Sequence, residues 1–205
     1  MQFYRSLERS PRRLGIFPGA FNPVTVAHMA LASAALSVVD EVLFILPRDL
    51  PHKTYAGAAF PGRIAMLRAA IGVRRAYSLA STEGGLFAEI AAECRAVYGE
   101  AVRMSFLCGR DVAERVAGWD YGTPDAYAGM LREFGLLVAA RQGVYRPPQA
   151  YAHAIEPLEI QSDFEGVSAT EVRARIARGA EWEMLVPAEV RELAARIYRT
   201  ASSGY

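Results

Sequence analysis

The chain has few of the residues that build disulfide frameworks and metal centres. Its 205 residues include two cysteines and three histidines, with no Cys-x-x-Cys pair and no other ligand spacing. Cys94 and Cys108 both lie in apolar stretches, which is typical of buried thiols in a reducing compartment. The sequence therefore argues against a disulfide scaffold and against a structural zinc site.

The chain also lacks net charge and long hydrophobic runs. Lys and Arg number 23 and Asp and Glu number 22, so the formal charge is +1 and no global basic field would attract nucleic acid. No apolar run reaches the roughly 18 residues that a membrane span needs, and residues 1–13 carry charges in place of a signal-peptide core. We expect a soluble, cytoplasmic protein that binds neither nucleic acid nor membranes, with any phosphate chemistry confined to a local site.

The chain does have enough apolar material for one core. Hydrophobic residues make up 52% of it, and a fold of this length buries roughly 70% of the surface that its unfolded chain exposes. The length favours one domain. We expect an N-terminal arm over 1–12, a single domain over 13–199 and a tail over 200–205.

Apolar runs alternate with segments of helical spacing along the whole domain. The unbroken apolar runs predict buried strands over 14–17, 42–46, 76–80, 104–108 and 136–140. Helical spacing and helix-end signals predict helices over 27–39, 62–72, 86–98, 112–117, 168–178 and 188–198. This alternation favours an α/β fold, a Rossmann-like parallel sheet with helices on both faces, followed by C-terminal helices. Sheets of this kind bind ligands at the carboxyl ends of their strands.

The segment after the first predicted strand has the composition of an anion site. Gly19 allows a tight turn, and the helix that opens near residue 26 adds the positive end of its dipole. His28 lies in the first helical turn, where an imidazole can donate to a phosphate oxygen, and Thr25 offers a hydroxyl nearby. An ordinary N-capped helix with a hydrogen-bonded histidine explains the same spacing, so both interpretations stay open at this point.

The same segment resembles a signature loop of the class I nucleotidylyltransferases. Residues 15–28 read GIFPGAFNPVTVAH and are similar to the GxFDPxxxGH loop, whose (H/T)xGH element marks the triphosphate site. The resemblance implies that Gly19, Phe21 and Asn22 bind ATP. It also implies catalytic roles for Thr25 and His28. Asn22 stands where the family often has Asp.

A second segment, residues 166–173, reads GVSATEVR. By itself it is typical of a capping box, with Ser168 as the N-cap and Glu171 three residues later. It also resembles the ISSTxIR motif of the same family, in which a helix start and its arginine hold the β- and γ-phosphates. That resemblance implies that Ser168 and Thr170 bind ATP. Arg173, whose forked guanidinium suits phosphate oxygens, would be catalytic.

A third segment combines the end of a predicted strand with an acid and an aromatic ring. Gly109 and Asp111 follow the run 104–108, and Trp119 lies eight residues beyond Asp111. Helix capping by Asp111 and a core tryptophan would explain this pattern. The pattern also resembles the GxD…W segment of bacterial nicotinate-nucleotide adenylyltransferases, which implies that Gly109 and Asp111 bind ATP and that Trp119 binds the acceptor.

Two further loops bear on the acceptor. Residues 51–53 resemble the PPHK element of that branch, which implies that Lys53 lies near the acceptor phosphate with His52 beside it. An exposed loop is the alternative. Residues 83–89 read EGGLFAE where the branch has an SYTxDT-like element that reads the nicotinate carboxylate. Because buried hydrogen-bonding groups of that kind decide specificity, the identity of the acceptor stays open.

The resemblance implies that ATP and a small phosphorylated acceptor are the partners. The phosphate of nicotinate or nicotinamide mononucleotide would attack the α-phosphorus of ATP, with Mg²⁺ carried by the phosphates, giving a dinucleotide and pyrophosphate in NAD biosynthesis. One alternative is adenylyl or cytidylyl transfer to another phosphorylated acceptor. Another is a catalytically silent nucleotide sensor, since Ala27 and Ala169 replace motif residues. No metal site made of protein residues alone is expected, and a homo-oligomer stays possible.

Overall fold

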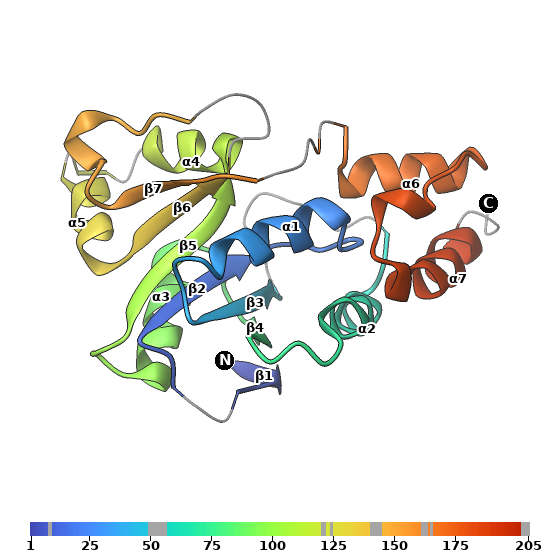
Figure 1. The fold of residues 1–205 in the computed structure, drawn as a ribbon, viewed down its shortest axis with the longest axis horizontal. Coiled ribbons are helices and arrows are strands. Elements are labelled where there is room, and N and C mark those ends of the chain that lie inside the picture. Colours follow the sequence, from blue (N-terminus) through green and yellow to red (C-terminus); the bar gives the residue numbers. More distant parts are fainter. Residues whose placement is uncertain are drawn as a thin grey trace.

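The structure is a computed structural model that describes residues 1–7, 10–48, 57–119, 122–123, 125–139, 145–160, 164 and 166–201. These residues form one seven-stranded sheet with the order β1-β4-β3-β2-β5-β6-β7 (Figure 1). The strands are β1 (Gln2–Arg5), β2 (Arg13–Pro18), β3 (Glu41–Pro47), β4 (Tyr77–Thr82), β5 (Arg103–Gly109), β6 (Gly135–Ala139) and β7 (Ile155–Leu158). All neighbours pair in parallel except β1, which runs antiparallel along β4.

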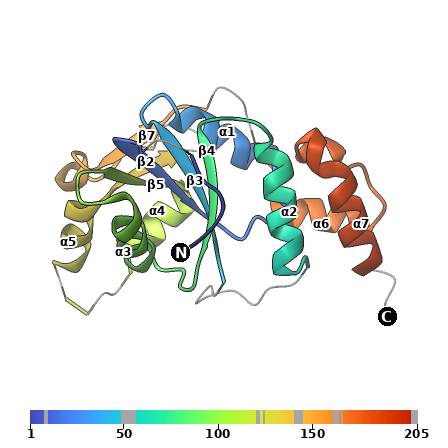
Figure 2. The ribbon, with the colours of Figure 1, turned by 90° about the horizontal axis from the view of Figure 1, so that it is seen from below.

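Helices cover both faces of the sheet (Figures 1 and 2). They are α1 (Val26–Ala35), α2 (Phe60–Ile71), α3 (Phe87–Tyr98), α4 (Arg110–Ala117), α5 (Ala126–Glu133), α6 (Ala169–Ala177) and α7 (Arg191–Ala201). Single 3₁₀ turns lie at η1 (Gln149–Tyr151), η2 (Glu183–Leu185) and η3 (Ala188–Val190). The arrangement confirms the expected α/β fold with a mostly parallel sheet. Among the described residues, no helix combines the length and the apolar character needed to cross a membrane.

The core has one layer on each face of the sheet. Buried side chains of α1, α2, α6 and α7 pack on one face, and those of α3, α4 and α5 pack on the other. The run of β3 shows why its sequence is apolar without a break. Val42 and Phe44 contribute to the first layer and Leu43 and Ile45 to the second, so successive side chains are buried on opposite faces.

Three elements of the structure were not predicted from the sequence: β1, β7 and α5. β1 lies among the residues that we expected to form an N-terminal arm, and it adds an antiparallel edge to the sheet. β7 is an edge strand, which explains how it accommodates Pro157. α5 has eight residues and contains Gly129, so its helical signal is weak. In addition, α1 ends at Ala35, earlier than the predicted end at residue 39.

Candidate active site

The order of the strands places a ligand crevice between β2 and β5. From β2 the chain winds outward through β3 to β4, whereas β5, β6 and β7 follow on the other side of β2. The loops after β2 and β5 therefore leave the sheet in opposite directions at the same carboxyl edge. Crevices of this kind are where open parallel sheets bind their ligands. Two of the three segments singled out from the sequence lie here, after β2 and after β5.

The loop after β2 turns tightly and buries an aromatic side chain. The backbone N–H of Gly19 donates to the carbonyl of Ile45 at 3.0 Å. A Cβ at Gly19 would lie 3.0 Å from the ring of Phe21, so this glycine lets the backbone and the ring come close. Phe21 has a φ of 45°, in the left-handed region that non-glycine residues rarely adopt. Its ring is buried against Phe17 and Phe44, at centroid distances of 5.3 and 5.6 Å.

Thr25 and His28 form a reciprocal cap at the start of α1. The backbone N–H of Thr25 donates to His28 Nδ1 at 2.9 Å, and His28 N donates to Thr25 Oγ1 at 3.4 Å. Because a backbone N–H can only donate, Nδ1 is an acceptor, and the proton of the neutral imidazole is on Nε2. Thr25 is fully buried, and its hydroxyl lies 2.7 Å from Nδ1. Thr25 therefore fixes the tautomer of the imidazole through its backbone N–H, and its hydroxyl helps to orient the ring.

The side chain of Asn22 ties the loop to two distant helices. Its Oδ1 accepts a hydrogen bond from the backbone N–H of Ala58, next to α2, at 3.0 Å. The same oxygen accepts from the hydroxyl of Tyr198, on α7, at 2.6 Å. Asn22 and Tyr198 are both about 5% exposed, so these bonds are shielded from water. Burial also raises the pKa of the Tyr198 hydroxyl, which keeps it a donor.

Two guanidinium groups hold carbonyl oxygens of the same loop. Arg173, on α6, donates to the backbone carbonyl of Asn22 and to Thr170 Oγ1, the latter at 3.3 Å. Arg63, on α2, is buried and donates to the carbonyl of Ala20 at 3.3 Å. The structure thus brings the segment 166–173 against the loop after β2. It also adds Arg63 and Tyr198, which sequence reasoning missed because nothing in their local sequence marks a tertiary partner.

At the start of α6, one of the two hydrogen bonds of the expected capping box is formed. Ser168 is the N-cap, and its Oγ accepts from the backbone N–H of Glu171 at 3.0 Å. The carboxylate of Glu171 does not return to the cap. It pairs with Arg175 at 2.7 Å and with Arg178 at 2.9 Å, and these hydrogen bonds lower its pKa, Arg175 having the larger effect. The Glu171 carboxylate thus pairs with arginines of its own helix and its C-cap. The N–H groups at the helix start lie near Arg173.

Comparison with known proteins assigns the family. A family model described as cytidylyltransferase-like matches residues 16–175, which include the loop after β2 and most of α6. The chain belongs to this family of nucleotidyltransferases. The probable nicotinate-nucleotide adenylyltransferase of Gloeobacter violaceus is 33% identical over 195 residues, which cover 87% of this chain and 91% of that protein. The one of Pelobacter propionicus is 31% identical and covers 87% and 93%.

A solved structure supports the same fold. The nicotinic acid mononucleotide adenylyltransferase of Plasmodium falciparum, complexed with NaAD, aligns with a TM-score of 0.69 at 15% sequence identity. The alignment covers 91% of this chain and 97% of that one. Together these comparisons confirm the resemblance to nicotinate-nucleotide adenylyltransferases that the motifs of the sequence indicated.

The segment after β5 lies at the same edge as the family's signature loop. α4 begins directly after Gly109, and a Cβ at this glycine would lie 2.7 Å from Asp111 Oδ1. The Asp111 side chain is 76% exposed and lies 3.9 Å from Arg115. Trp119 follows α4 and is 46% exposed. The alternative of a core tryptophan is therefore wrong, and both side chains are accessible to a ligand.

The two remaining acceptor segments differ in how far they can be placed. His52 and Lys53 lie outside the described residues. The polar groups in and next to segment 83–89 bond to one another and to Arg48. Thr82 Oγ1 donates to the carbonyl of Gly84 at 2.8 Å, and the backbone N–H of Leu86 donates to Glu89 Oε2 at 3.1 Å. Glu83 pairs with Arg48 at 3.2 Å.

Proposed function

We propose that this nucleotidyltransferase joins the adenylyl group of ATP to the phosphate of nicotinate mononucleotide, forming a dinucleotide of NAD biosynthesis and releasing pyrophosphate. The observation that carries this proposal is the contact of Arg173 with the loop that ends in Thr25 and His28. It assembles a cation, an imidazole and a helix start at the crevice between β2 and β5. The names of the relatives support the nicotinate nucleotide as acceptor.

In this reaction the protein aligns two phosphates and stabilises the charge that develops between them. The acceptor phosphate is itself the nucleophile, so no covalent enzyme intermediate is required. His28 would donate its Nε2–H to an oxygen of the reacting phosphate, because Nδ1 is held by Thr25. Arg173 would bind the β- and γ-phosphates and stabilise the leaving pyrophosphate. Thr25 acts as a positioning residue for the imidazole.

The rest of the ATP molecule would lie along the two loops. Gly19, Phe21 and Asn22 shape the loop after β2 that approaches the nucleotide. Gly109 and Asp111 follow the neighbouring strand, where an exposed carboxylate suits the hydroxyl groups of a ribose. The start of α6, with Ser168 and Thr170, offers N–H groups and a hydroxyl to phosphate oxygens. These residues therefore divide between the adenosine and the triphosphate.

The acceptor would lie on the side of Trp119. Its exposed ring is suited to stack on a pyridine ring. Lys53 and His52 would bind the acceptor phosphate, a role that rests on the resemblance alone. Since Thr82 and Glu89 form hydrogen bonds within residues 82–89, the carboxylate of nicotinate would be recognised by other groups than in the family pattern.

The donor set fits a Mg²⁺ ion that is bound mainly by phosphate oxygens and water. Among the described residues there is no group of three or more His, Cys, Asp or Glu side chains that could hold a metal. Mg²⁺ requires few protein ligands when phosphates supply the oxygens, and it would neutralise phosphate charge. Asp111 is the acidic side chain of the described site that is accessible to such an ion or to its water shell.

Pyrophosphate release from ATP and Mg²⁺ tests this function. Nicotinate mononucleotide, nicotinamide mononucleotide and phosphopantetheine are compared as acceptors, with CTP in place of ATP in a parallel series. We expect turnover with ATP and nicotinate mononucleotide, lost in Arg173→Ala and retained in Arg75→Ala, a matched exposed arginine outside the site. Nucleotide binding without release for any acceptor would contradict the proposal and favour a sensor.

A further inference from the structure

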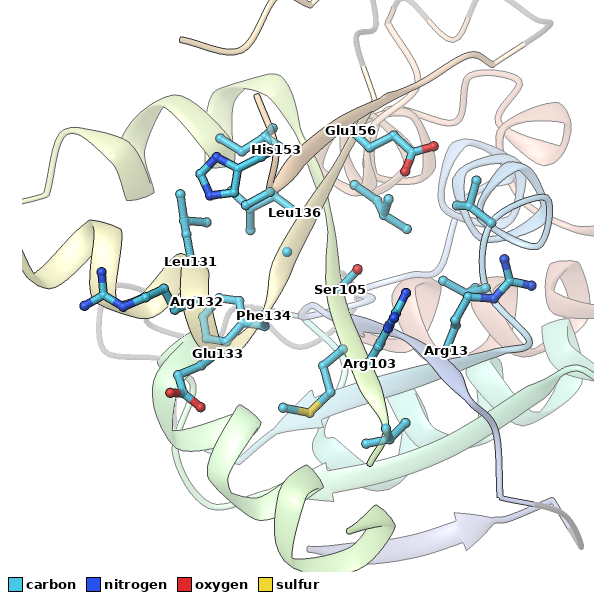
Figure 3. A pocket seen from close by; sticks show the side chains of 18 of the residues that line it. Arg13, Arg103, Ser105, Leu131, Arg132, Glu133, Phe134, Leu136, His153 and Glu156 are labelled. Atoms are coloured by element: carbon cyan, nitrogen blue, oxygen red, sulfur yellow. The ribbon is translucent and has the colours of Figure 1, made fainter. Parts of the chain in front are cut away.

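A cavity of about 800 Å³ lies at the amino ends of β2, β5, β6 and β7, at the edge of the sheet opposite the active site (Figure 3). Its volume is in the range of cavities that hold small metabolites. Polar residues that line it include Arg13, Arg103, Ser105, Arg132, His153 and Glu156. No residue of the active site takes part, so the inference that follows does not rest on the proposed function.

Part of the cavity lining is a close approach between neighbouring strands. Ser105 on β5 pairs with Gly135 on β6. A Cβ at Gly135 would lie 2.9 Å from the carbonyl oxygen of Ala154 and 3.3 Å from Ser105 Oγ. Only glycine fits there without displacing the backbone of the neighbouring strand. The glycine thus lets the carbonyl of Ala154 come close to β6 beside the Ser105 hydroxyl, and Val38 and Val39 supply an apolar wall of the cavity.

Two arginines face each other across neighbouring strands at this cavity. Arg13 on β2 and Arg103 on β5 are in direct register, and Figure 3 shows their side chains next to one another. Like charges in directly opposite positions repel. Asp40 compensates one of them, because its carboxylate pairs with Arg13 at 2.8 Å, and this hydrogen bond is the main reason that the pKa of Asp40 is lowered.

The charge of Arg103 is left without a counterion. In the part of the chain that the structure describes, its exposed guanidinium has no hydrogen bond and no ion pair. Arg132 and His153 add further cationic or protonatable groups at the other end of the cavity (Figure 3). Two carboxylates, Glu133 and Glu156, also line it. Asp40 and Glu100 pair with Arg13 and Arg95, so the arginines of the lining that form no ion pair within the described residues are Arg103 and Arg132.

The arginine Arg95 is the exception among the lining cations. Its guanidinium donates to the backbone carbonyls of Gly99, Glu100 and Val102, the last at 2.8 Å. It is thus part of the framework. The groups that face a ligand are Arg13 and Arg103, with the Ser105 hydroxyl two residues further along the same strand face. Forked guanidinium groups beside a hydroxyl are suited to the oxygens of a phosphate group.

We propose that this cavity is a second ligand site, which binds a small phosphate-bearing metabolite with its phosphate against Arg103, Arg13 and Ser105. Binding relieves the repulsion between the two arginines, and the wall formed by Val38 and Val39 accepts an uncharged part of the ligand. Because the attraction is between charged groups at an exposed edge, the affinity decreases with ionic strength.

Titration of ¹⁵N-labelled protein with inorganic pyrophosphate, followed by amide NMR, tests the proposal. Pyrophosphate also suits the active site, so the readout is local. We expect saturable shifts at the amides of Val39, Ser105 and Gly135, separate from shifts in the loop after β2. Arg103→Gln should raise the dissociation constant for the first set at least tenfold, and Arg103→Lys, which keeps the charge without the fork, should raise it less.

The control is Arg75→Gln, an exposed arginine away from the cavity, which should bind like the wild type. The proposal is overturned if pyrophosphate shifts only the amides of the active site. It is equally overturned if Arg103→Gln binds with unchanged affinity. Malonate, a dicarboxylate of similar size, is titrated in parallel, and equal affinity for malonate would overturn the assignment to phosphate. Thermal unfolding of each variant verifies that it is folded.

Discussion

The two edges of the sheet differ in how they hold the arginines that would meet a ligand. At the carboxyl edge, Arg63 and Arg173 donate to backbone carbonyls of one loop. In the same loop, the buried Oδ1 of Asn22 accepts a hydrogen bond from the Tyr198 hydroxyl. At the amino edge, Asp40 pairs with Arg13 alone, and within the described residues Arg103 has no partner.

The difference follows from what each edge has to do. Catalysis benefits from groups that are held in place before the substrate arrives, because no free energy is then lost in orienting them. At the amino edge, Arg103 is exposed and has no side-chain partner within the described residues, so its rotamer freedom would be lost only when a ligand binds. The carboxyl edge is therefore preorganised, and the amino edge is charged but adaptable.

The largest expected effect on activity is at His28, on the carboxyl edge. Replacement by alanine removes a preorganised donor, and loss of one such donor typically lowers kcat by about 10² to 10³. We expect a decrease of this size in His28→Ala, measured as pyrophosphate release at saturating substrates. Thr25→Ser keeps a capping hydroxyl and should retain most of the activity. A change in KM with kcat intact would contradict the catalytic role.

A smaller effect is expected from the buried hydroxyl of Tyr198. Tyr198→Phe keeps the ring but leaves the Oδ1 of Asn22 with one donor instead of two. Loss of such a bond costs about 1 kcal/mol, which should appear as a lower midpoint of thermal unfolding together with a severalfold lower kcat. The control is Tyr151→Phe, whose half-buried ring packs on Tyr127. If the variant lost stability but kept its activity, the Tyr198 hydroxyl would not be needed to position the loop.

The amino edge also carries a buried carboxyl group, that of Glu41 at the start of β3. Burial raises the pKa of Glu41 above its ordinary 4.5, although hydrogen bonds from Ser78 and Tyr98 oppose this shift. The unfolded chain then releases the proton at lower pH than the folded protein. The free energy of unfolding should therefore fall as pH rises from about 4.5 through the raised pKa. Denaturant titrations should show this fall in the wild type and not in Glu41→Gln.

The smallest effect is expected at Asp40. Its pKa is lowered by Arg13, so its contribution to stability is present above the ordinary carboxyl value and is lost as pH falls through the lowered pKa. The pair is exposed, so Asp40→Asn should cost less than about 1 kcal/mol. The same variant should tighten pyrophosphate binding at the amino edge a few fold, since it removes the counterion of Arg13. Weaker binding would contradict this.

The sequence predicted those features that depend on neighbouring residues. The loop over 15–28 and the helix start at Ser168 were recognisable because turn residues, caps and motif spacing are local. Arg63 and Tyr198 were not, since the contact that matters for each is a hydrogen bond to a loop far away in the chain. Glu171 matched the capping spacing, but its neighbours Arg175 and Arg178 compete for the carboxylate.

The two strands that escaped prediction lie at the margins of the sheet. β1 and β7 are edge strands with a mixed or broken apolar pattern, so neither shows the run that marks a doubly buried strand. The cavity at the amino edge escaped for another reason. It depends on the register that brings Arg13 beside Arg103 and Ser105 beside Gly135, and register is a property of paired strands.

The bond between Asn22 and Tyr198 joins residues that are 176 positions apart. During synthesis the loop after β2 leaves the ribosome long before α7, and contacts of such separation form late because the intervening chain must first be closed. The loop after β2 can therefore form this bond only after nearly the whole chain has been made. We expect nascent chains that lack α7 to bind nucleotide more weakly than the complete chain, because the Asn22 side chain then has one donor fewer.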